Sequence, residues 1–453
     1  MKKALSILLA LVMAVSLFAC GTKTENPATT PGESNPATTP EAGNPGAPAE
    51  TPLPEKNPAK PYPNANDDGT LNLDTVGHYD YEYDYTQNEK FKIAYLATEN
   101  SFLYQMAANA YEHWAPIFNM EWAGFLSAAG DTDMFLTNLQ NLIDQGVKGF
   151  VLDPDTTVFP AILELLANYP DVKWMSQMAP PRDGATGEGV PIGGDLINPY
   201  VGFDNFDAGA QQVYKLIEWK NANLPDVPYE EIGLISMAFS TSPPLQERVI
   251  GAKQVWDEQG IPAVKNVNYF EVDTASAGLT LQGGLDSVGP IISTHTEFKH
   301  WLVMGLIDDL CQAAASIIDQ QGLTEGSCSV AFGGSGLVAQ WDGGQLDSAR
   351  YALYTANNLY SEPILGAVYA YLMGWATPDT IWPSWVKWDD HGGAGHTYPQ
   401  LRLPTVWLEP DDYKHYLEWS DWYAKADEYK YDVPVGPDDY SPFIEVPADF
   451  KAP

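Results

Sequence analysis

Short apolar segments alternate with amphipathic ones along most of this chain, and that alternation constrains the fold more than any other feature. In the first α/β unit, four apolar segments have the length of strands: residues 91–97, 122–127, 149–152 and 172–176. Between them, apolar residues recur every three or four positions over residues 102–118, 131–145 and 157–169, which is the period of a helix. Strands that alternate with helices form parallel sheets covered by helices on both faces. The order therefore predicts an α/β unit.

The same alternation of expected strands and helices then begins again after residue 199. The expected strands are residues 200–203, 232–237, 269–272, 301–304, 329–332 and 351–355. The expected helices are residues 208–219, 245–259, 308–321 and 363–373. Two α/β units in tandem predict two similar lobes with a cleft between them. Because ligands of open α/β sheets bind at the carboxyl ends of the strands, loops from both lobes are expected to line that cleft.

The N-terminus has the pattern of an exported protein. Lys2 and Lys3 precede a short apolar run, and a small residue, Ala19, stands before Cys20. The run is too short to span a bilayer comfortably and reads as a signal peptide over residues 1–19. A cysteine directly after the cleavage site resembles a bacterial lipobox, which predicts lipidation of Cys20 and an extracytoplasmic, membrane-anchored protein. The alternative is an ordinary signal peptide followed by a chance cysteine.

Low-complexity sequence follows Cys20. Its first part repeats Asn-Pro-Ala-Thr-Thr-Pro at residues 26–31 and 35–40 and is almost empty of large apolar residues up to about Thr70. Such a segment buries too little apolar surface to offset the entropy of ordering. We therefore expect residues 20–84 to form a disordered linker.

Composition excludes some partners. The 453 residues carry 60 acidic and 23 basic side chains, a net charge of −37, which argues against nucleic acid and against broad contact with anionic lipids. Two cysteines remain besides Cys20. Cys311 and Cys328 either pair or stand separately as small buried side chains. No cysteine spacing typical of a metal site occurs.

Several local patterns together resemble the type I periplasmic binding proteins, in particular their sugar-binding group. They are Lys92-Ile93-Ala94-Tyr95-Leu96, the run from Leu142 to Pro154, Val201-Gly202-Phe203-Asp204-Asn205 with Ala208-Gly209, Arg248-Val249-Ile250-Gly251, and Pro363-Ile364-Leu365-Gly366. The resemblance covers about residues 90–416. It implies two Rossmann-like lobes with parallel sheets, joined by a hinge, with a ligand cleft between them.

The resemblance also suggests domain boundaries. The N-terminal lobe would comprise residues 85–203 plus 357–399, the C-terminal lobe residues 204–356 plus 400–435, and a tail residues 436–453. Three features depart from the family pattern. Asp308-Asp309 replaces Asn-Asp, Gly333 stands where a sugar-binding aspartate is usual, and the Trp- and His-rich segment 382–399 has no counterpart.

Candidate ligand-binding residues follow the expected strands. Glu99, Asn100, Phe102 and Tyr104 follow the first strand and offer the polar groups and aromatic faces that a polyol needs, although a helix cap and core packing would also explain them. Asp153 ends the third strand, where a turn or cap is the alternative.

The second half of the chain adds further candidates. Arg248 is a ligand-binding residue by resemblance, and its alternative is a surface ion pair. Asp308 follows a strand, where it can bind ligand, cap the next helix, or both. Tyr360 lies near the second crossing between the lobes, and Asp204 and Asn205 lie at the first, where we expect a hinge.

No catalytic residues, cofactor or metal site are predicted. Gly-x-Ser-x-Gly and the phosphate-binding Gly-rich loop are absent from the sequence, and His391 and His396 in their glycine-rich loop are expected to be solvated rather than to bind metal. The resemblance implies a monomeric solute-binding lipoprotein that delivers a sugar or polyol to the permease of an ABC importer. The alternatives are a sensor that presents the ligand to a membrane receptor and, less in keeping with the sequence, a carbohydrate-active enzyme.

Overall fold

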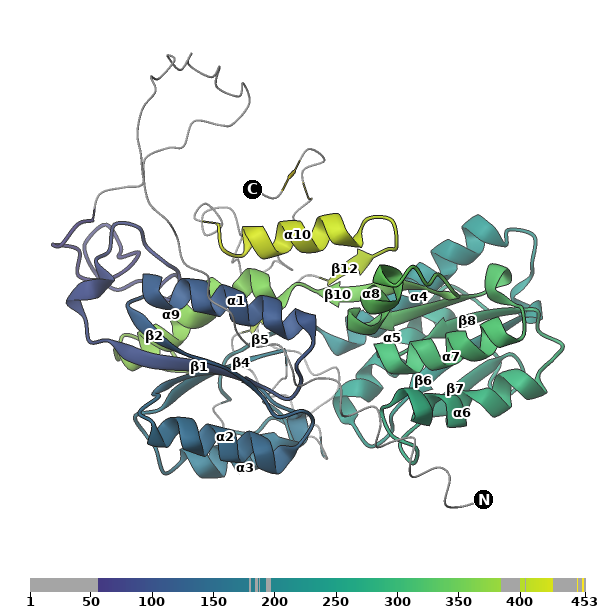
Figure 1. Ribbon diagram of the computed structural model, residues 1–453, viewed down its shortest axis with the longest axis horizontal. Coiled ribbons are helices and arrows are strands. Elements are labelled where there is room, and N and C mark those ends of the chain that lie inside the picture. Colours follow the sequence, from purple (N-terminus) through teal and green to yellow (C-terminus); the bar gives the residue numbers. More distant parts are fainter. Residues whose placement is uncertain are drawn as a thin grey trace, which may run out of the picture. The chain divides into compact units, whose positions relative to one another are not determined.

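The computed structural model describes residues 56–178, 181–183, 186, 188–192, 197–383, 400–403, 405–426, 446 and 450–451. Within them the chain forms two six-stranded sheets (Figure 1). The strand order is β11-β5-β4-β3-β1-β2 in the first sheet and β12-β10-β9-β8-β6-β7 in the second. All neighbouring strands are parallel except β10 and β12, which pair antiparallel. The predicted pair of parallel α/β lobes is confirmed.

The first lobe is built on the first sheet. Its strands are β1 (Phe91–Ala97), β2 (Met120–Ser127), β3 (Gly149–Asp153), β4 (Lys173–Gln177), β5 (Tyr200–Gly202) and β11 (Gln400–Arg402). Its helices are η1 (Tyr85–Gln87), α1 (Phe102–Ile117), α2 (Thr132–Asp144), η2 (Thr156–Val158), α3 (Phe159–Leu166), η5 (Asn357–Tyr360) and α9 (Ser361–Leu372). Helices α1 and α9 cover one face of the sheet, and α2 and α3 cover the other (Figure 1). Because both faces are covered, every residue of β3 is buried.

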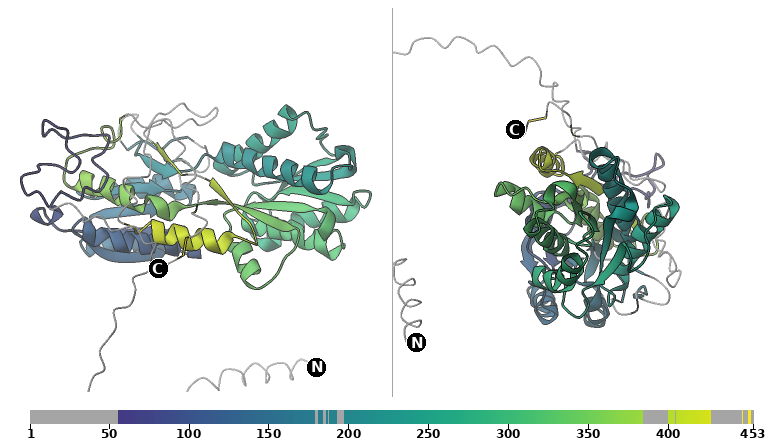
Figure 2. Two further views of the ribbon diagram at one scale, coloured as in Figure 1. Left: turned by 90° about the horizontal axis from the view of Figure 1, so that it is seen from above. Right: turned by 90° about the vertical axis from the view of Figure 1, so that its right-hand side faces the viewer.

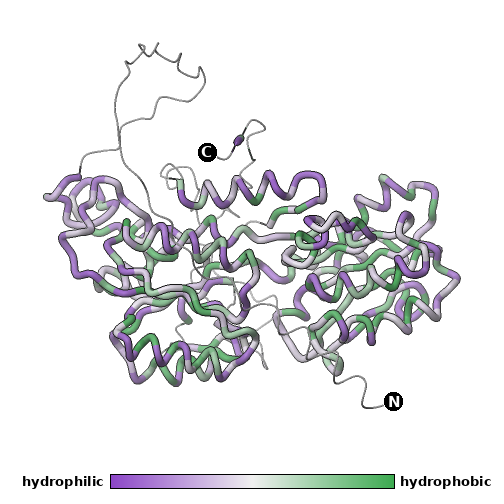
Figure 3. Tube along the Cα trace, in the orientation of Figure 1, coloured by the Kyte–Doolittle hydropathy of each residue, from purple (hydrophilic) through white to green (hydrophobic). Residues whose placement is uncertain are grey.

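The second lobe repeats this arrangement on the second sheet. Its strands are β6 (Ile232–Ala238), β7 (Tyr269–Asp273), β8 (His300–Met304), β9 (Cys328–Phe332), β10 (Ala349–Thr355) and β12 (Thr405–Leu408). Its helices are α4 (Asn205–Asn223), η3 (Tyr229–Glu231), α5 (Pro243–Glu258), α6 (Leu281–Thr294), α7 (Asp308–Gln320), η4 (Thr324–Gly326) and α8 (Ser335–Asp342). Figure 2 shows α4 and α5 on one face of the sheet and α7 and α8 on the other. Figure 3 shows hydrophobic residues concentrated along the strands of both lobes.

Side-chain caps explain where the key helices begin. The Oδ1 atom of Asp131 accepts a hydrogen bond from the backbone N–H of Met134 at 2.8 Å and so begins α2, and Gly146 follows its end with φ at +84°. In the same way, the Oδ1 atom of Asp204 accepts from the N–H of Asp207 at 3.1 Å and begins α4. Asp204 therefore fixes where the chain turns from the first lobe into the second.

Within the described residues the chain crosses between the lobes three times, at residues 203–204, at residue 356, and between β11 and β12. The third crossing lies between the other two. The backbone N–H of Leu403 donates to the carbonyl of Gly202 at 2.9 Å, and Thr405 is paired with Thr355 across the β10–β12 ladder. The crossings therefore form one hydrogen-bonded ribbon.

The predicted boundary at residue 400 requires correction. Strand β11 pairs with β5 and so belongs to the first sheet, and only β12 joins the second. Helix α10 (Tyr413–Tyr423) then contacts both lobes. At its C-terminal end the Trp114 Nε1–H donates to the carbonyl of Ala424 at 2.7 Å, and at its start the Tyr413 hydroxyl donates to Asp342 at 2.8 Å.

The predicted disordered linker also extends too far. Residues 56–84 are folded onto the first lobe, because tyrosines at alternating positions bury their rings there. Tyr79, Tyr81, Tyr83 and Tyr85 are at most 9% exposed, and the Tyr79 ring packs at 5.7 Å from that of Trp114. Lys56 Nζ donates to the Tyr79 hydroxyl at 3.1 Å. The signal peptide, Cys20 and the rest of the linker up to residue 55 lie outside the described residues, as does 384–399 of the Trp- and His-rich segment.

Two smaller points concern the cysteines and membranes. Cys311 on α7 and Cys328 on β9 are both buried and free, so they do not pair, and burial raises the pKa of both thiols.

None of the helices in the described part of the chain is long and apolar enough to cross a membrane.

Candidate functional site

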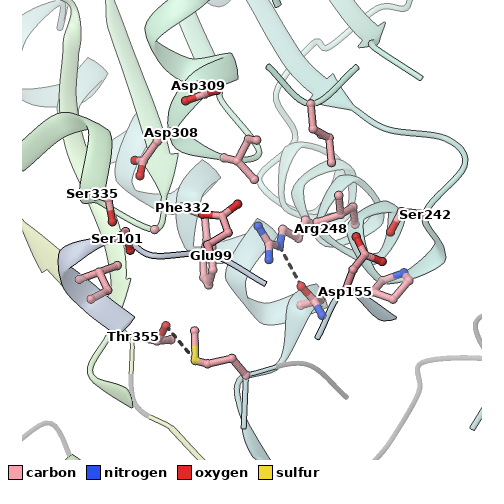
Figure 4. Close-up of a pocket in the computed structure, with 18 of the residues that line it drawn as sticks. Glu99, Ser101, Asp155, Ser242, Arg248, Asp308, Asp309, Phe332, Ser335 and Thr355 are labelled. Atoms are coloured by element: carbon pink, nitrogen blue, oxygen red, sulfur yellow. Dashed lines mark hydrogen bonds between the residues drawn. The ribbon is translucent and has the colours of Figure 1, made fainter. Parts of the chain in front are cut away.

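A cavity of about 700 Å³ lies where the loops at the carboxyl ends of strands from both sheets meet (Figure 4). From the first lobe it is lined by the residues after β1 and β3 and by Met178 after β4. From the second lobe it is lined by the residues after β6, β8 and β9. Glu99, Tyr104, Asp153, Arg248 and Asp308, which the sequence analysis proposed as ligand-binding residues, all line it. Asn100, Phe102 and Tyr360 do not.

Of the residues that follow β1, only those on one face of helix α1 and at its start face the cavity. Ser101 and Tyr104 line the cavity, and residues three apart share one face of a helix. Phe102 lies on another face and lines a groove with Val338 and Tyr413 instead, so its expected stacking on a ligand is not supported. The Asn100 side chain is exposed and accepts a hydrogen bond from Gln105.

Asp153 is the most enclosed carboxylate of the cavity. Asp153 is the last residue of β3, and only 4% of it is exposed to solvent. The Tyr95 hydroxyl donates to its Oδ2 atom at a long 3.4 Å. Burial raises the pKa of Asp153 well above its usual range, the hydrogen bond from Tyr95 opposes this, and the charge of Glu99 adds to it.

Arg248 is held rigidly in the wall of the cavity. Its Nε–H donates to the Oδ1 atom of Asn205 and its Nη1 to the carbonyl of Leu306, both at 2.8 Å (Figure 4 shows the first). Its guanidinium lies 3.9 Å from the centroid of the Phe332 ring and 5.3 Å from that of Phe203. Burial lowers the pKa of Arg248 to about 9, so it is charged at neutral pH. The other terminal nitrogen, Nη2, makes no hydrogen bond with any described residue and is available to a ligand.

Asp308 connects two helices rather than capping its own. It is the first residue of α7, but its carboxylate accepts from the backbone N–H groups of Gly334 and Gly336 at 2.9–3.1 Å, at the start of α8. Burial raises the pKa of Asp308 to about 6 despite these hydrogen bonds, and the charge of Asp309 contributes. A Cβ atom on Gly333, where the family has its aspartate, would stand 3.1 Å from Asp308. The two carboxylates would therefore crowd each other, which explains why glycine suits this position.

The remaining predicted residues lie near the crossings. Asn205 lines the cavity and positions Arg248, while Asp204 caps α4. Tyr360 ends η5 and is 1% exposed in the core of the first lobe, so it does not face the cavity.

Sequence reasoning missed several lining residues. Phe203, Phe332 and Asp309 line the cavity, and so do residues Thr241 and Ser242 of the loop between β6 and α5. The rule that ligands bind at the carboxyl ends of parallel strands, applied to every strand, would have found this loop. Within the described residues, no group of three or more His, Cys, Asp or Glu side chains is arranged to hold a metal ion.

Comparisons with known proteins agree with this architecture. No family model matches the sequence, and no curated protein matches it. Among solved structures, a periplasmic ribose ABC transporter from Conexibacter woesei DSM 14684 has a TM-score of 0.52 at 14% identity, with 74% of this chain and 97% of that chain covered. A sugar ABC transporter (sugar-binding protein) from Bacillus halodurans has a TM-score of 0.53 at 11% identity, with 72% of this chain and 100% of that chain covered. The described chain therefore has the two-lobed α/β fold of the type I periplasmic binding proteins.

Proposed function

We propose that this protein is an extracytoplasmic binding protein that captures a small hydroxyl-rich ligand, a sugar or polyol, between its two lobes and delivers it to an ABC importer. The observation that carries the proposal is the cavity itself, which strand-end loops of both sheets build together. A ligand seated there contacts both lobes at once, so its binding favours their closure about the crossings near Asp204 and Asn205.

The chemistry of the lining suits hydroxyl groups. Arg248 offers the hydrogens of Nη2 as donors, and Asp153 offers its second oxygen as an acceptor. Phe203 and Phe332 line the cavity and supply apolar surface for the C–H side of a sugar ring. Because an unpaired buried polar group is costly, this pattern of donors and acceptors selects the ligand without any chemical conversion.

The importer and the anchor complete the proposal. The likeness in fold to two ABC transporter proteins supports delivery to a permease. The Ala19-Cys20 sequence supports attachment to the membrane by lipid. Mass spectrometry of the protein purified from membranes should then find a lipidated N-terminal Cys20, and an unmodified N-terminus would contradict the anchor.

A thermal-shift screen followed by calorimetry tests the binding function. Sugars, polyols, nucleosides and amino acids are added in turn, since a ligand that binds only the folded state raises its apparent stability. We expect a hydroxylated ligand to raise the melting temperature and to be recovered unchanged by NMR. Conversion of the ligand would contradict the proposal and favour an enzyme.

Replacing Arg248 by alanine tests the site within that screen. The change removes a donor from the buried wall, so we expect the affinity for the ligand found to fall about tenfold or more. Glu258→Gln, on the exposed side of the same helix α5, should leave the affinity unchanged. Calorimetry that finds equal affinity for Arg248→Ala and the wild type would show that the ligand binds elsewhere.

A further inference from the structure

The cavity is lined by far more negative than positive charge. Five carboxylates line it, and Arg248 is the one basic side chain among its lining residues. Figure 4 shows Glu99 between Arg248 and the pair formed by Asp308 and Asp309. No ion pair joins Arg248 to any of the five carboxylates within the described chain, since its hydrogen bonds go to Asn205 and Leu306. The guanidinium therefore leaves the acidic side of the cavity unneutralised.

Three of the five carboxylates are satisfied by the protein backbone. Asp155 accepts from the N–H and hydroxyl of Thr157. Asp308 accepts from the start of α8, as described above. Asp309 accepts from the N–H of Leu281 at 3.2 Å. These groups have structural partners whether or not a ligand is present.

The other two carboxylates, Glu99 and Asp153, are not satisfied in this way. Glu99 is exposed to solvent and has no hydrogen bond or ion pair with any described residue, whereas Asp153 is 4% exposed and has only the 3.4 Å contact from Tyr95. They stand at the ends of β1 and β3, which are adjacent strands with Ala97 opposite Asp153. Their carboxylates therefore lie on the same edge of the first sheet.

The electrostatics of the pair depend on both lobes. Partial removal from water raises the pKa of Glu99, and the charge of Asp309 from the second lobe raises it further. The charge of Glu99 in turn contributes to the raised pKa of Asp153. Closing the lobes on a neutral ligand would leave these like charges crowded, whereas a cationic group between them would relieve the repulsion.

We propose that the ligand carries a protonated amine as well as hydroxyl groups, as an amino sugar does, and that Glu99 and Asp153 receive the ammonium group. The inference rests on the proposed function and names the ligand class of the same site. An ammonium suits the site better than a divalent cation, because no set of three metal-ligating side chains exists among the described residues. The hydroxyls of Thr241, Ser242 and Ser335 also line the cavity and remain for the neutral end of the ligand.

Matched pairs of ligands test the inference. Glucose, galactose and mannose are compared by calorimetry at pH 7 with glucosamine, galactosamine and mannosamine, and with the N-acetylated forms, which keep the nitrogen but lose the charge. We expect at least one amino sugar to bind ten times or more tighter than both its neutral counterparts. Glu99→Gln should reduce that preference to threefold or less, while Glu258→Gln, on the exposed face of α5, should preserve it.

The outcomes separate the two proposals. Neutral sugars that bind as tightly as amino sugars overturn the amine assignment and leave the binding function standing. Absence of binding by any member of the three series, and by the ligands of the thermal-shift screen, overturns the binding function itself. A preference for amino sugars that survives both Glu99→Gln and Asp153→Asn, in variants shown by circular dichroism to be folded, overturns the assignment of these two residues.

Discussion

Asp308 makes folding stability depend on pH in a direction that is unusual for an aspartate. Its carboxylate holds the start of α8, but burial costs the charged form more than the backbone hydrogen bonds return, and its pKa rises from 3.8 to about 6. The folded protein therefore binds more protons than the unfolded chain between these values, and stability from this group is lost as the pH rises through them.

We predict that Asp308→Asn removes this dependence. Relative to the wild type, the variant should gain stability as the pH rises from about 4 to about 6, by up to about 3 kcal/mol, and the difference should be constant above pH 7. Chemical denaturation of both proteins across this range measures the difference. A free-energy difference that is independent of pH would mean that Asp308 has the same pKa in the folded protein as in the unfolded chain.

Single residues also show where prediction from sequence ends. The strand-end rule correctly singled out Asp153 and Asp308 for the cavity edge, because the end of a strand can be recognised from its apolar run. It failed at Phe102, since one helical position, about 100° of rotation, decides whether a side chain faces the cavity. Tyr360 was proposed for its place near the second crossing, but it lies in the core, because its burial depends on packing between segments far apart in the sequence.

At the scale of elements, the position of Arg248 depends on how closely α4 and α5 cross. A Cβ atom on Gly209 would stand 1.9 Å from the carbonyl oxygen of Arg248, and one on Gly251 would stand 2.0 Å from that of Phe206. Both contacts are with backbone atoms, which cannot move aside as a flexible side chain can. The two glycines therefore allow the close approach that brings Arg248 to Asn205.

We predict that Gly251→Ala forces the two helices apart. The expected loss of stability is about 1–3 kcal/mol or more, together with weaker ligand binding as Arg248 shifts. Gly289→Ala in α6 is the matched control. A Cβ there would meet only Ile317 at 3.8 Å, so the change should stabilise the protein by up to about 1 kcal/mol through helix propensity. Equal melting temperatures for the two variants would contradict this account.

The segment before β1 is a second element with a testable role. Residues 56–87 bury four tyrosines against α1 and α9, and a Cβ on Gly366 would stand 1.7 Å from the carbonyl oxygen of Gly77. We predict that a chain beginning at Asn88 is less stable than one beginning at Lys56, by several kcal/mol, because it exposes this aromatic surface to water. Equal denaturation midpoints for the two chains would show that the segment is dispensable.

Elements with a strong sequence pattern were predictable and weak ones were not. The alternation of apolar runs located every strand from β1 to β10. Helix α6 escaped, because Gly283, Gly284 and Pro290 interrupt its apolar pattern. The packing of residues 56–84 was missed because the Pro- and Thr-rich sequence before them extends the low-complexity pattern, while their tyrosines are buried by one another and by segments far away in the sequence, such as α1, α9 and Trp375.

At the scale of the whole molecule, an ion pair joins the two lobes beside the cavity. Arg182, in the loop between β4 and β5, donates from Nη1 to Glu247 Oε1 on α5 at 2.6 Å, and the two side chains are 3% and 15% exposed. The pair forms only when the lobes are close together, and removing one partner would leave the other charge buried and unpaired, which destabilises that arrangement.

We predict that Glu247→Gln shifts the protein toward an open arrangement. Small-angle scattering of the ligand-free variant should give a larger radius than the wild type, and ligand affinity should fall roughly tenfold, because a smaller share of the molecules is ready to bind. Asp257→Asn breaks an exposed pair with Lys253 on the same helix and should change neither quantity. Unchanged scattering in Glu247→Gln would mean that the ion pair does not influence closure.

The ribbon of three crossings restricts how one lobe can move relative to the other. One crossing strand would let the lobes swivel about any axis, but Leu403 is bound to Gly202 and Thr405 is paired with Thr355, so the three strands resist twisting against one another. The ribbon therefore favours bending of the lobes about the crossings over twisting of one lobe against the other. A ligand held by one lobe then meets the other at a high effective concentration and in a fixed orientation, so that little rotational entropy is left to lose when the cavity closes.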